Sequence, residues 1–467
     1  MDAELIKQVF IDVSYLGASV LFIFGLKGLT APNTARRGMY FAEVGMALAI
    51  IGTLLQASVV TYTGILIGLV LGSLIGVAIA MLTPMTAMPE RTALSHACGA
   101  LAVTLVGVAE YYHHGAALGS GKMIAIGFEV LFGALTITGS LIAMGKLQGI
   151  IKGTPVTFKG QNAFNFALFF ALIGMFFYLI FVPGQALVFY IMTALALVFG
   201  VLFVMPIGAA DMPVVISLLN SYAGLAACAT GFALGNNILI IGGALDGASG
   251  LILSIIMCKA MNRSITNVLF GAFGQVANSG NAPASSADAS QRIRELKVDE
   301  AAEIFRNAQR VVIVPGYGLA VAQAQHAVRE FADILKSKNI DVKYAIHPVA
   351  GRMPGHMNVL LAEANVPYDE LVEMDDINSQ FPQTDVSLVI GANDVVNPAA
   401  HSNPGSPIYG MPILEVDKSM NVIVLKRSMN PGFAGIENEL FYNPKTSMVF
   451  GDAKDTMNKF VHELKHG

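Results

Sequence analysis

The chain has 467 residues, of which 54% are hydrophobic and only 13% are charged. Soluble domains carry about 25% charged residues, so this composition excludes an ordinary soluble protein and indicates a membrane protein. Residues 1–263 hold only 11 of the 28 Lys and Arg and 9 of the 32 Asp and Glu, which predicts one boundary near residue 263 between a charge-poor membrane part and a soluble part.

Nine segments of the first part are apolar over roughly the 17–25 residues that a bilayer requires. They must be helical, because lipid offers no partners for backbone N–H and C=O groups. The residues before the first segment lack the basic leader and cleavage site of a signal peptide, so we expect this helix to be retained. The expected spans are 8–27, 39–55, 62–83, 92–112, 123–145, 163–182, 185–205, 212–234 and 237–258.

Positive charges gather on one set of the connecting loops. The loops 28–38, 84–91 and 146–162 and the exit after 258, together with Lys27 at the edge of the first loop, hold nine Lys and Arg, and the alternate set holds two. This bias predicts an inner (cytoplasmic) membrane protein with its N-terminus outside and its C-terminal domain in the cytoplasm. The nine are Lys27, Arg36, Arg37, Arg91, Lys146, Lys152, Lys159, Lys259 and Arg263, and the two are Lys7 and Lys122.

Several polar side chains interrupt the predicted spans, where ionisable groups usually face a pathway or a partner. His96 is the one whose ordinary pKa lies near physiological pH, which suits a proton relay. Ser140 and Asn220 could hold water or hydrogen-bond the imidazole, or they could simply join helices, as Ser221 could. Glu129 and Asp246 are further acids in the spans, with no role indicated.

The three cysteines, Cys98, Cys228 and Cys258, lie in apolar stretches without a Cys-x-x-Cys pattern. This arrangement gives little support to a disulfide framework or a zinc site, and we expect no metal.

Residues 264–295 are rich in Ser, Ala, Asn and Gly, which is typical of a flexible linker. From residue 296 the pattern alternates between apolar strands and amphipathic helices, which predicts a Rossmann-like parallel sheet covered by helices. The expected domains are thus a transmembrane bundle (1–263), the linker (264–295) and an α/β domain (296–467). The expected strands are 310–315, 342–346, 386–391, 412–416, 421–425 and 447–450, and the expected helices are 318–336, 355–364 and 453–465.

A glycine-rich turn follows the strand 310–315 and precedes a helix. Gly316 permits a tight turn after the strand, and Gly318 allows a pyrophosphate to approach the backbone at the helix N-terminus. Tyr317 lies between them, and the third fingerprint position is Val321 instead of Gly or Ala. The position between strand and helix favours a dinucleotide site, and a plain turn is the alternative.

Two further strand ends carry polar residues. Strand 421–425 runs into Lys426, Arg427 and Ser428, whose charges and hydroxyl suit a 2′-phosphate and favour NADP over NAD; a solvated surface pair is the alternative. Strand 386–391 ends in the run from Gly391 through Asn393 to Asp394. Ligands of open parallel sheets lie beyond the carboxyl ends of the strands, although a lone Asp more often forms a turn.

These pieces together resemble one family, the beta subunit of proton-pumping NAD(P) transhydrogenase, over nearly the whole chain. The resemblance is densest in 208–215 (GAADMPVV), 219–224 (LNSYAG), 257–264 (MCKAMNRS), 314–325 (VPGYGLAVAQAQ), 346–362 (IHPVAGRMPGHMNVLLA), 391–400 (GANDVVNPAA) and 425–430 (LKRSMN).

The resemblance implies a reaction. Hydride would pass between NADP(H) on this chain and NAD(H) on a separate alpha subunit, coupled to proton translocation, in a dimer of alpha–beta units in the membrane. It implies proton-handling roles for His96, Ser140, Asn220 and Asp211, and a coupling role near the nicotinamide for Asp394. It also implies that Gly316, Gly318, Val321, Arg352, Lys426, Arg427 and Ser428 bind the nucleotide.

One position departs from the pattern, because Phe433 stands where the family often has tyrosine, so a hydrogen bond from there is in doubt. Two other functions stay open from the sequence. One is an NADP-sensing membrane transporter without redox activity, and the other is a scaffold subunit with a degenerate site. Nothing in the sequence indicates binding of nucleic acid.

Overall fold

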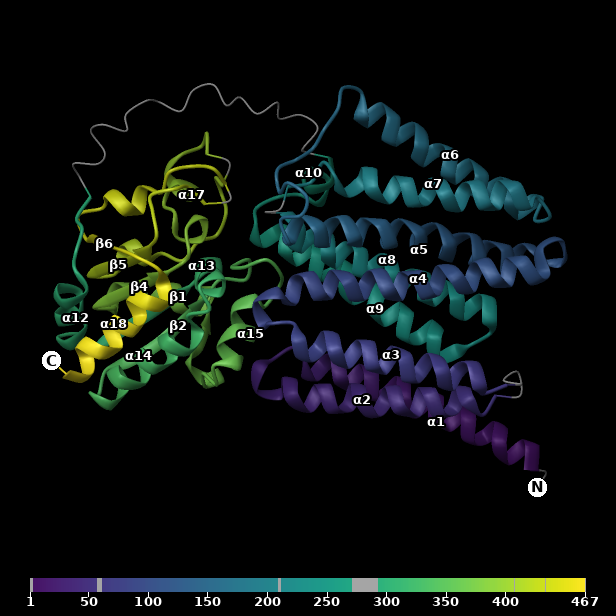
Figure 1. The fold of residues 1–467 in the computed structure, drawn as a ribbon, viewed down its shortest axis with the longest axis horizontal. Helices are drawn as coiled ribbons and strands as arrows, with labels where there is room; N and C mark the ends of the chain where they lie inside the picture. The colour runs from purple at the N-terminus through teal and green to yellow at the C-terminus, as the bar shows by residue number, and fades with distance from the viewer. Residues whose placement is uncertain are drawn as a thin grey trace. The chain divides into compact units, whose positions relative to one another are not determined.

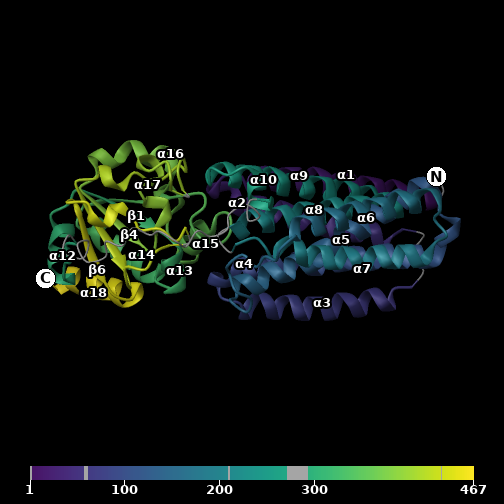
Figure 2. The same ribbon diagram turned by 90° about the horizontal axis from the view of Figure 1, so that it is seen from above.

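The computed structural model describes residues 3–56, 61–208, 211–270, 293–406, 408–432 and 434–466. The chain forms two compact units (Figures 1 and 2). The first consists of Met1–Pro84, Glu90–Ile207 and Val215–Ser254, and the second of Met85–Pro89, Gly208–Val214 and Ile255–Gly467.

Nine helices among the described residues are long and apolar enough to cross a membrane. The nine predicted spans are confirmed, with ends that shift by a few residues. The helices are α1 (Ala3–Gly28), α2 (Pro32–Leu54), α3 (Thr63–Leu82), α4 (Met88–His114), α5 (Ser120–Leu147), α6 (Gln161–Phe181), α7 (Ala186–Val204), α8 (Met212–Leu234) and α9 (Asn237–Ala260).

Helix α5 lies inside the bundle, whereas α3 exposes all of its length. Met123 and Ile126 of α5 pack with Leu172 of α6 and Phe189 of α7 in one apolar cluster. None of the residues of α3, all of which are described, is buried. A helix that is apolar all round and uncovered in its own chain faces lipid or a partner helix.

Helices α8 and α9 pack backbone against backbone through glycines. A Cβ on Gly224 would clash with the backbone of Gly247, and one on Gly243 would clash with that of Cys228. Ser221 Oγ donates to Gly247 O over 2.6 Å across the same contact. Small residues let spanning helices approach closely, so this pair is fixed over much of its length.

The second unit contains a six-stranded sheet in the order β3-β2-β1-β4-β5-β6, and every pairing is parallel. This order is that of a doubly wound dinucleotide-binding fold, with a switch point between β1 and β4. The predicted fold class is therefore confirmed. The strands are β1 (Arg310–Pro315), β2 (Asp341–Ile346), β3 (Leu371–Glu373), β4 (Val386–Ile390), β5 (Asn421–Lys426) and β6 (Thr446–Phe450).

Successive residues of the strands alternate between two apolar cores. Val311 and Ile313 belong to the core under the long helices, whereas Val312 and Val314 belong to the core on the other face. Both faces are covered, so the strands are apolar throughout, as parallel strands generally are. The first core is covered by α12 (Val298–Arg306), α13 (Tyr317–Val321), α14 (Gln325–Ser337), α15 (His356–Glu363) and α18 (Ala453–His466).

The predicted helix 318–336 is two helices. α13 ends at Val321 and α14 begins at Gln325, and Gln323 between them has a φ of 50°. Apolar residues continue through the break, so their spacing alone did not reveal it.

The predicted strand 412–416 is wrong. This stretch is a buried loop whose backbone bonds to the Asn378 side chain instead of to a neighbouring strand. Asn378 Nδ2 donates to Ile413 O over 2.9 Å, and Asn378 Oδ1 accepts from Glu415 N over 3.1 Å. Pro412 has no N–H to give to a sheet. Burial of Ile413 and Leu414 explains the strand-like composition.

The segment 264–295 begins with a short helix, α10 (Ile265–Phe270). At its other end Glu295 forms a parallel bridge with Met448 of β6. Residues 271–292, the bulk of the predicted linker, lie outside the described residues, so the linker stays a prediction.

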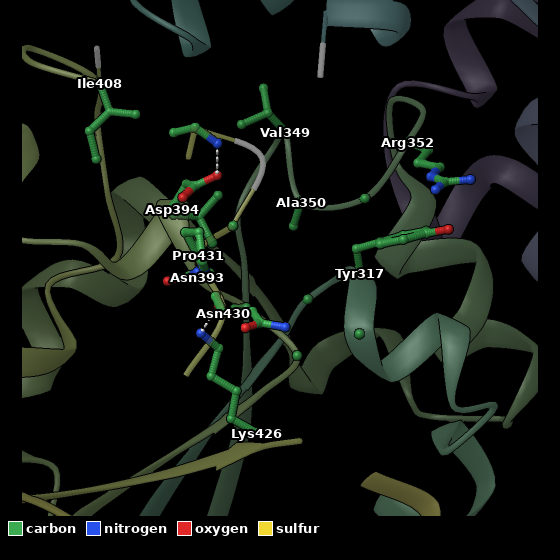
Figure 3. A pocket seen from close by; sticks show the side chains of 18 of the residues that line it. Tyr317, Val349, Ala350, Arg352, Asn393, Asp394, Ile408, Lys426, Asn430 and Pro431 are labelled. Atoms are coloured by element: carbon green, nitrogen blue, oxygen red, sulfur yellow. Dashed lines mark hydrogen bonds between the residues drawn. The ribbon is translucent and has the colours of Figure 1, made fainter. Parts of the chain in front are cut away.

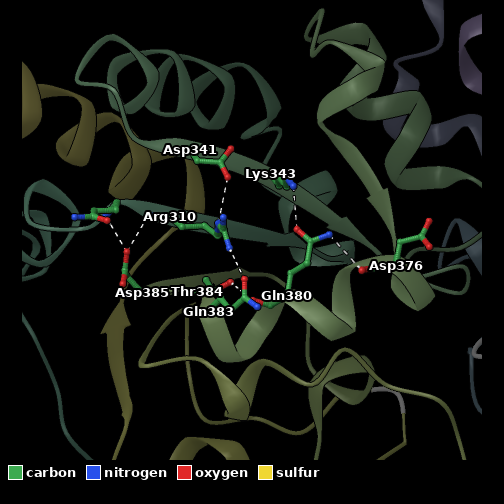
Figure 4. A network of polar contacts seen from close by, with 9 residues as sticks. Arg310, Asp341, Lys343, Asp376, Gln380, Gln383, Thr384 and Asp385 are labelled. Carbon is green, nitrogen blue, oxygen red and sulfur yellow. Dashed lines mark hydrogen bonds and ion pairs between the residues drawn. The ribbon is translucent and has the colours of Figure 1, made fainter.

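A polar network joins the amino ends of β1, β2 and β4, at the edge opposite to the glycine turn (Figure 4). Asp385 Oδ2 accepts from the backbone N of Gln309 over 2.8 Å and of Arg310 over 2.9 Å. The Arg310 side chain donates to Asp341 Oδ2 and Gln383 Oε1, each over 3.2 Å. Asp385 therefore fixes where β1 begins relative to β4.

We expect Asp385→Ala to lower the free energy of unfolding by about 1–3 kcal/mol, because it removes two charge-assisted hydrogen bonds to strand backbone. The control is Asp341→Ala, which breaks an exposed ion pair and should cost less than about 1 kcal/mol. The measurement is urea unfolding of a fragment of about residues 290–467. Equal effects of the two substitutions would contradict the proposed anchoring.

Candidate functional site

A pocket opens at the carboxyl edge of the sheet, where β1, β4 and β5 end (Figure 3). Ligands of this fold occupy that edge at the switch point. The domain's lining residues are Gly316, Tyr317, Gly318, Ala322, Val349, Ala350, Gly351, Arg352, Gly391, Ala392, Asn393, Asp394, Val395, Ile408, Met411, Leu425, Lys426, Arg427, Ser428, Asn430, Pro431, Gly432, Ala434, Gly451 and Ala453.

Three glycines form the floor of the pocket by direct backbone contact. Gly316 N donates to Ile390 O over 2.8 Å, and Gly318 N donates to Gly391 O over 2.9 Å. A Cβ on Gly316 or Gly318 would clash with backbone at 391–392, and Gly391 has a φ of 66°. The glycines thus let two strand-end turns touch and keep the floor free of side chains.

Lys426 is half-buried and aimed into the pocket. Its Nζ donates to Asn430 O over 2.5 Å and lies 4.7 Å from the centre of the Phe441 ring. Burial lowers the pKa of Lys426, while the nearby Asp394 acts in the opposite direction. Arg427 and Ser428 follow and are exposed. Lys426 is thus held against the pocket wall, whereas the two residues after it are solvated.

Asp394 contacts the segment that follows Lys426 and Arg427. Its Oδ2 accepts from Ala434 N over 3.0 Å, and a Cβ on Gly432 would lie 2.6 Å from its Oδ1. Asn438 Nδ2 donates to both Asn393 O and Asn393 Oδ1 over 3.0 Å. The end of β4 and the segment 430–438 are therefore tied together beside the pocket. Phe433 itself lies outside the described residues.

Arg352 and Tyr317 form a stacked pair on the opposite wall. The guanidinium carbon lies 4.2 Å from the centre of the Tyr317 ring, within the range of a cation–π interaction (Figure 3). A flat cation over an aromatic ring presents donors and a planar surface to a ligand that carries both phosphate and rings.

Two buried histidines shape the loop that carries Arg352. His347 Nδ1 accepts from Val349 N over 3.2 Å, so the ring must carry its proton on Nε2, which donates to Pro412 O over 2.9 Å. His356 Nδ1 accepts from Arg352 N over 3.0 Å. Burial lowers the pKa of His347 to about 4, although the Pro412 carbonyl and Asp375 act in the opposite direction. Burial and then the Arg352 charge lower the pKa of His356 to about 4.

The pocket collects most of the predicted nucleotide-binding residues. Val321 is the exception, because it is 46% exposed and lies outside the lining. Sequence reasoning missed Val349 to Gly351, which follow β2, and Gly451, which follows β6. Gly451 stands directly after its strand and Val349 only three residues after the end of β2, and these positions near strand ends were the available signal.

The polar residues of the spans are also located. Helices α4 and α5 bury His96 Nδ1 and Ser140 Oγ, neither of which has a hydrogen-bond partner among the described residues. Asn220 of α8 donates from Nδ2 to Asp246 Oδ1 of α9 over 3.0 Å. The structure thus gives Asn220 an acidic partner that the sequence did not predict. Asp211, just before α8, pairs with Arg263 at 2.8 Å.

The residues of the pocket fit a dinucleotide. The glycine floor leaves room for a ligand against the backbone, and Lys426, Arg427 and Arg352 supply cations for phosphate. The part of the chain that the structure describes has no group of three or more His, Cys, Asp or Glu that could hold a metal ion.

Comparison with known proteins extends this picture to the whole chain. The sequence model of a family described as NAD(P) transhydrogenase beta subunit matches residues 11–463. The chain is 50% identical over 458 residues to the NAD(P) transhydrogenase subunit beta of Rhodospirillum rubrum, which covers 97% of this chain and 98% of the relative. A protein of the same name from a particular strain of that species shows the same identity and coverage.

We expect the domain to lose stability as pH falls from about 6.5 towards 4. The pKa of His347 is about 4 in the folded state, against about 6.5 when unfolded, so the unfolded chain binds the proton first. This linkage removes up to roughly 3 kcal/mol for such a shift and levels off below pH 4. Urea unfolding of the 290–467 fragment at several pH values would measure it.

The control for this pH dependence is His462→Gln, because the His462 side chain is 70% exposed on α18. That variant should keep the wild-type pH dependence, whereas His347→Gln should remove its own share and leave that of His356, whose pKa is also lowered to about 4. An unchanged slope in His347→Gln would contradict the assignment.

Proposed function

The chain belongs to the NAD(P) transhydrogenase beta subunit family, and from this we propose that it is the membrane-embedded, NADP(H)-binding subunit of a proton-pumping enzyme. Its partner would be an alpha subunit that binds NAD(H). Together they would exchange NADPH and NAD⁺ with NADP⁺ and NADH while a proton crosses the inner membrane. The domains would be the helices up to residue 263, the linker 264–295 and the nucleotide-binding domain 296–467.

The observation that carries this proposal is the pocket at the carboxyl ends of β1, β4 and β5 in a chain whose described residues include nine helices apolar and long enough to cross a membrane. The nicotinamide of the bound nucleotide supplies the hydride chemistry, and the protein supplies position and coupling. Lys426, Arg427 and Ser428 would hold the 2′-phosphate, and Gly316, Gly318 and Gly391 would admit the nucleotide to the backbone. Tyr317, Arg352 and Asn393 would border it.

Asp394 would link nucleotide binding to the protein's conformation. Its Oδ2 accepts from Ala434 N, so it already bridges the end of β4 and the segment after the basic pair. A change in this bridge would open or close that segment beside the pocket. Coupling of two sites requires two such states whose balance each site biases.

Proton movement would involve His96, with Ser140, Asn220 and Asp211 as polar partners. The two nucleotide couples have similar potentials, so the gradient must drive the reaction. A proton that enters under 100 mV contributes about 2.3 kcal/mol, which shifts the equilibrium roughly 50-fold. His96 suits this role because histidine is the side chain whose unperturbed pKa lies nearest to physiological pH.

The apolar surface of α3 supports a membrane partner. All of its residues are uncovered in this chain, so helices of the alpha subunit or lipid would cover it. A dimer of alpha–beta units in the inner membrane, with the N-terminus outside and the nucleotide domain in the cytoplasm, agrees with the Lys and Arg of the loops.

We expect the 290–467 fragment to bind NADP⁺ more tightly than NAD⁺ in calorimetry. Lys426→Ala with Arg427→Ala should weaken NADP⁺ binding by about 10–100-fold, since charge-assisted hydrogen bonds contribute about 1.5–3 kcal/mol, and should leave NAD⁺ binding unchanged. Lys459→Ala, on the exposed side of α18, is the matched control. Equal weakening of both nucleotides would contradict a 2′-phosphate site.

We expect His96→Ala to abolish proton-coupled hydride exchange in vesicles that contain this chain and its alpha subunit. NADP⁺ binding should persist, because the nucleotide pocket is unchanged. His113→Ala, an exposed histidine at the end of α4, is the control. Proton pumping at the wild-type rate in His96→Ala would rule out this mechanism, and substrate flux without hydride exchange in the wild type would favour a transporter.

A further inference from the structure

Glu129, in the first half of α5, is a fully buried carboxyl inside a membrane-spanning helix. Neither of its oxygens has a hydrogen-bond partner of normal geometry among the described residues. The Thr230 hydroxyl of α8 lies near it but donates to Ala226 O of its own helix over 3.0 Å. An ionised carboxylate in such a place would cost several kcal/mol, so this group carries a proton in the arrangement observed.

Glu129 lies where α4 and α5, two neighbouring helices that form a hairpin, are in contact (Figure 1). Two glycines locate this contact. A Cβ on Gly107 of α4 would clash with Glu129 Oε1, and a Cβ on Gly133 of α5 would clash with Thr104 Oγ1. These two contacts fix an antiparallel register in which residue numbers rise along one helix as they fall along the other.

The same register brings Ser140 to the level of His96. His96 is eleven residues before Gly107, and Ser140 is eleven residues after Glu129. Eleven residues make about three helical turns, so both pairs lie on the facing sides of the two helices, about 16 Å apart along the axis. His96 Nδ1 and Ser140 Oγ are buried without a partner among the described residues, like the Glu129 oxygens.

Two buried threonines occupy the interval between these levels. Thr104 Oγ1 of α4 donates to Ala100 O over 2.8 Å, and Thr136 Oγ1 of α5 donates to Phe132 O over 2.7 Å. Each hydroxyl oxygen keeps lone pairs that can accept a further hydrogen bond. The register that pairs Gly107 with Glu129 brings Thr136 opposite Ala100, one turn from the His96 level.

A charged cluster stands at the other end of the hairpin. Glu110 Oε1 lies 3.3 Å from His114 Nδ1 and 3.9 Å from Lys122 Nζ. The His114 and Lys122 side chains are both more than half exposed. A row of polar groups therefore runs along the α4–α5 contact from this exposed cluster to His96.

Polar residues in spans often serve to join helices, but that role requires the hydrogen bond to be made. Glu129 lies near the Thr230 hydroxyl of α8, but neither of its oxygens has a hydrogen-bond partner of normal geometry among the described residues, so the carboxyl is not committed to joining helices. We propose that Glu129 is a proton-carrying residue that relays protons between the Glu110–His114–Lys122 cluster and the His96–Ser140 level. Its carboxyl would give its proton towards His96 through the threonine hydroxyls and intervening water, and the resulting carboxylate would regain a proton from the cluster side.

This inference rests on the proposed proton translocation, and the test separates the two. The full chain with its alpha subunit is placed in lipid vesicles, NADPH and NAD⁺ are added, and proton movement is followed with a pH-sensitive dye. Glu129→Gln, which keeps the shape and removes the titrating proton, should lower the pumping rate at least tenfold. NADP⁺ affinity should stay within twofold of the wild type. Glu43→Gln, the same change at an exposed position of α2, should pump normally.

Each outcome decides one question. Wild-type vesicles that exchange hydride without moving protons would overturn the proposed function itself. Normal pumping by the wild type with less than a tenfold loss in Glu129→Gln would overturn the relay alone. If Glu129→Gln fails to assemble, Thr136→Val and Thr136→Ser decide instead. The valine variant should pump at least threefold more slowly than the serine variant, and equal rates would overturn the relay.

Discussion

The α/β half of the molecule depends on one backbone contact, in which the turn after β1 lies directly on the turn after β4. Gly316 and Gly318 give their N–H groups to Ile390 and Gly391, and any side chain on these glycines would force the turns apart. This contact closes the switch point of the sheet. Because the polar strand ends at 391–394 and 426–428 are attached to that edge, it also sets their separation. The Gly318 N–H is used in this contact, so it is the missing side chain at Gly318, and not its N–H, that leaves the floor of the pocket open.

The architecture could be predicted from the sequence where apolar runs are long or have clear polar boundaries. The nine spans are uniform apolar runs, and five of the six predicted strands are short apolar runs bounded by polar turns. The sequence predicted a strand wrongly where burial occurs without strand pairing. Ile413 and Leu414 are as buried as strand residues, but Asn378, from another segment, bonds Ile413 O and Glu415 N in place of a paired strand. Strand β3 was not predicted, because its three residues, Leu371–Glu373, lie at the sheet edge and are not fully buried.

The pocket shows the same division between local and distant information. Residues directly after predicted strands, such as Gly391 and Lys426, could be placed at the carboxyl edge, because parallel strands all end there. Other contacts join distant segments. Ala434 N donates to Asp394 Oδ2, 40 residues away, and His347 Nε2 donates to Pro412 O, 65 residues away. Such contacts depend on loop conformation, which a single sequence does not specify. In the structure His347 fixes the loop after β2 through such contacts.

The buried polar groups of the two halves differ in whether they are hydrogen-bonded, and this difference bears on function. His347 has both ring nitrogens bonded, so its burial is compensated and it acts as a structural residue. In the α4–α5 hairpin, His96 Nδ1, Ser140 Oγ and both Glu129 oxygens are buried without such bonds to described residues. Uncompensated burial costs free energy, and natural sequences keep such departures chiefly at functional sites. Their alignment along one helix contact is what a proton path requires, because a proton moves only between groups that are free to exchange their hydrogen bonds.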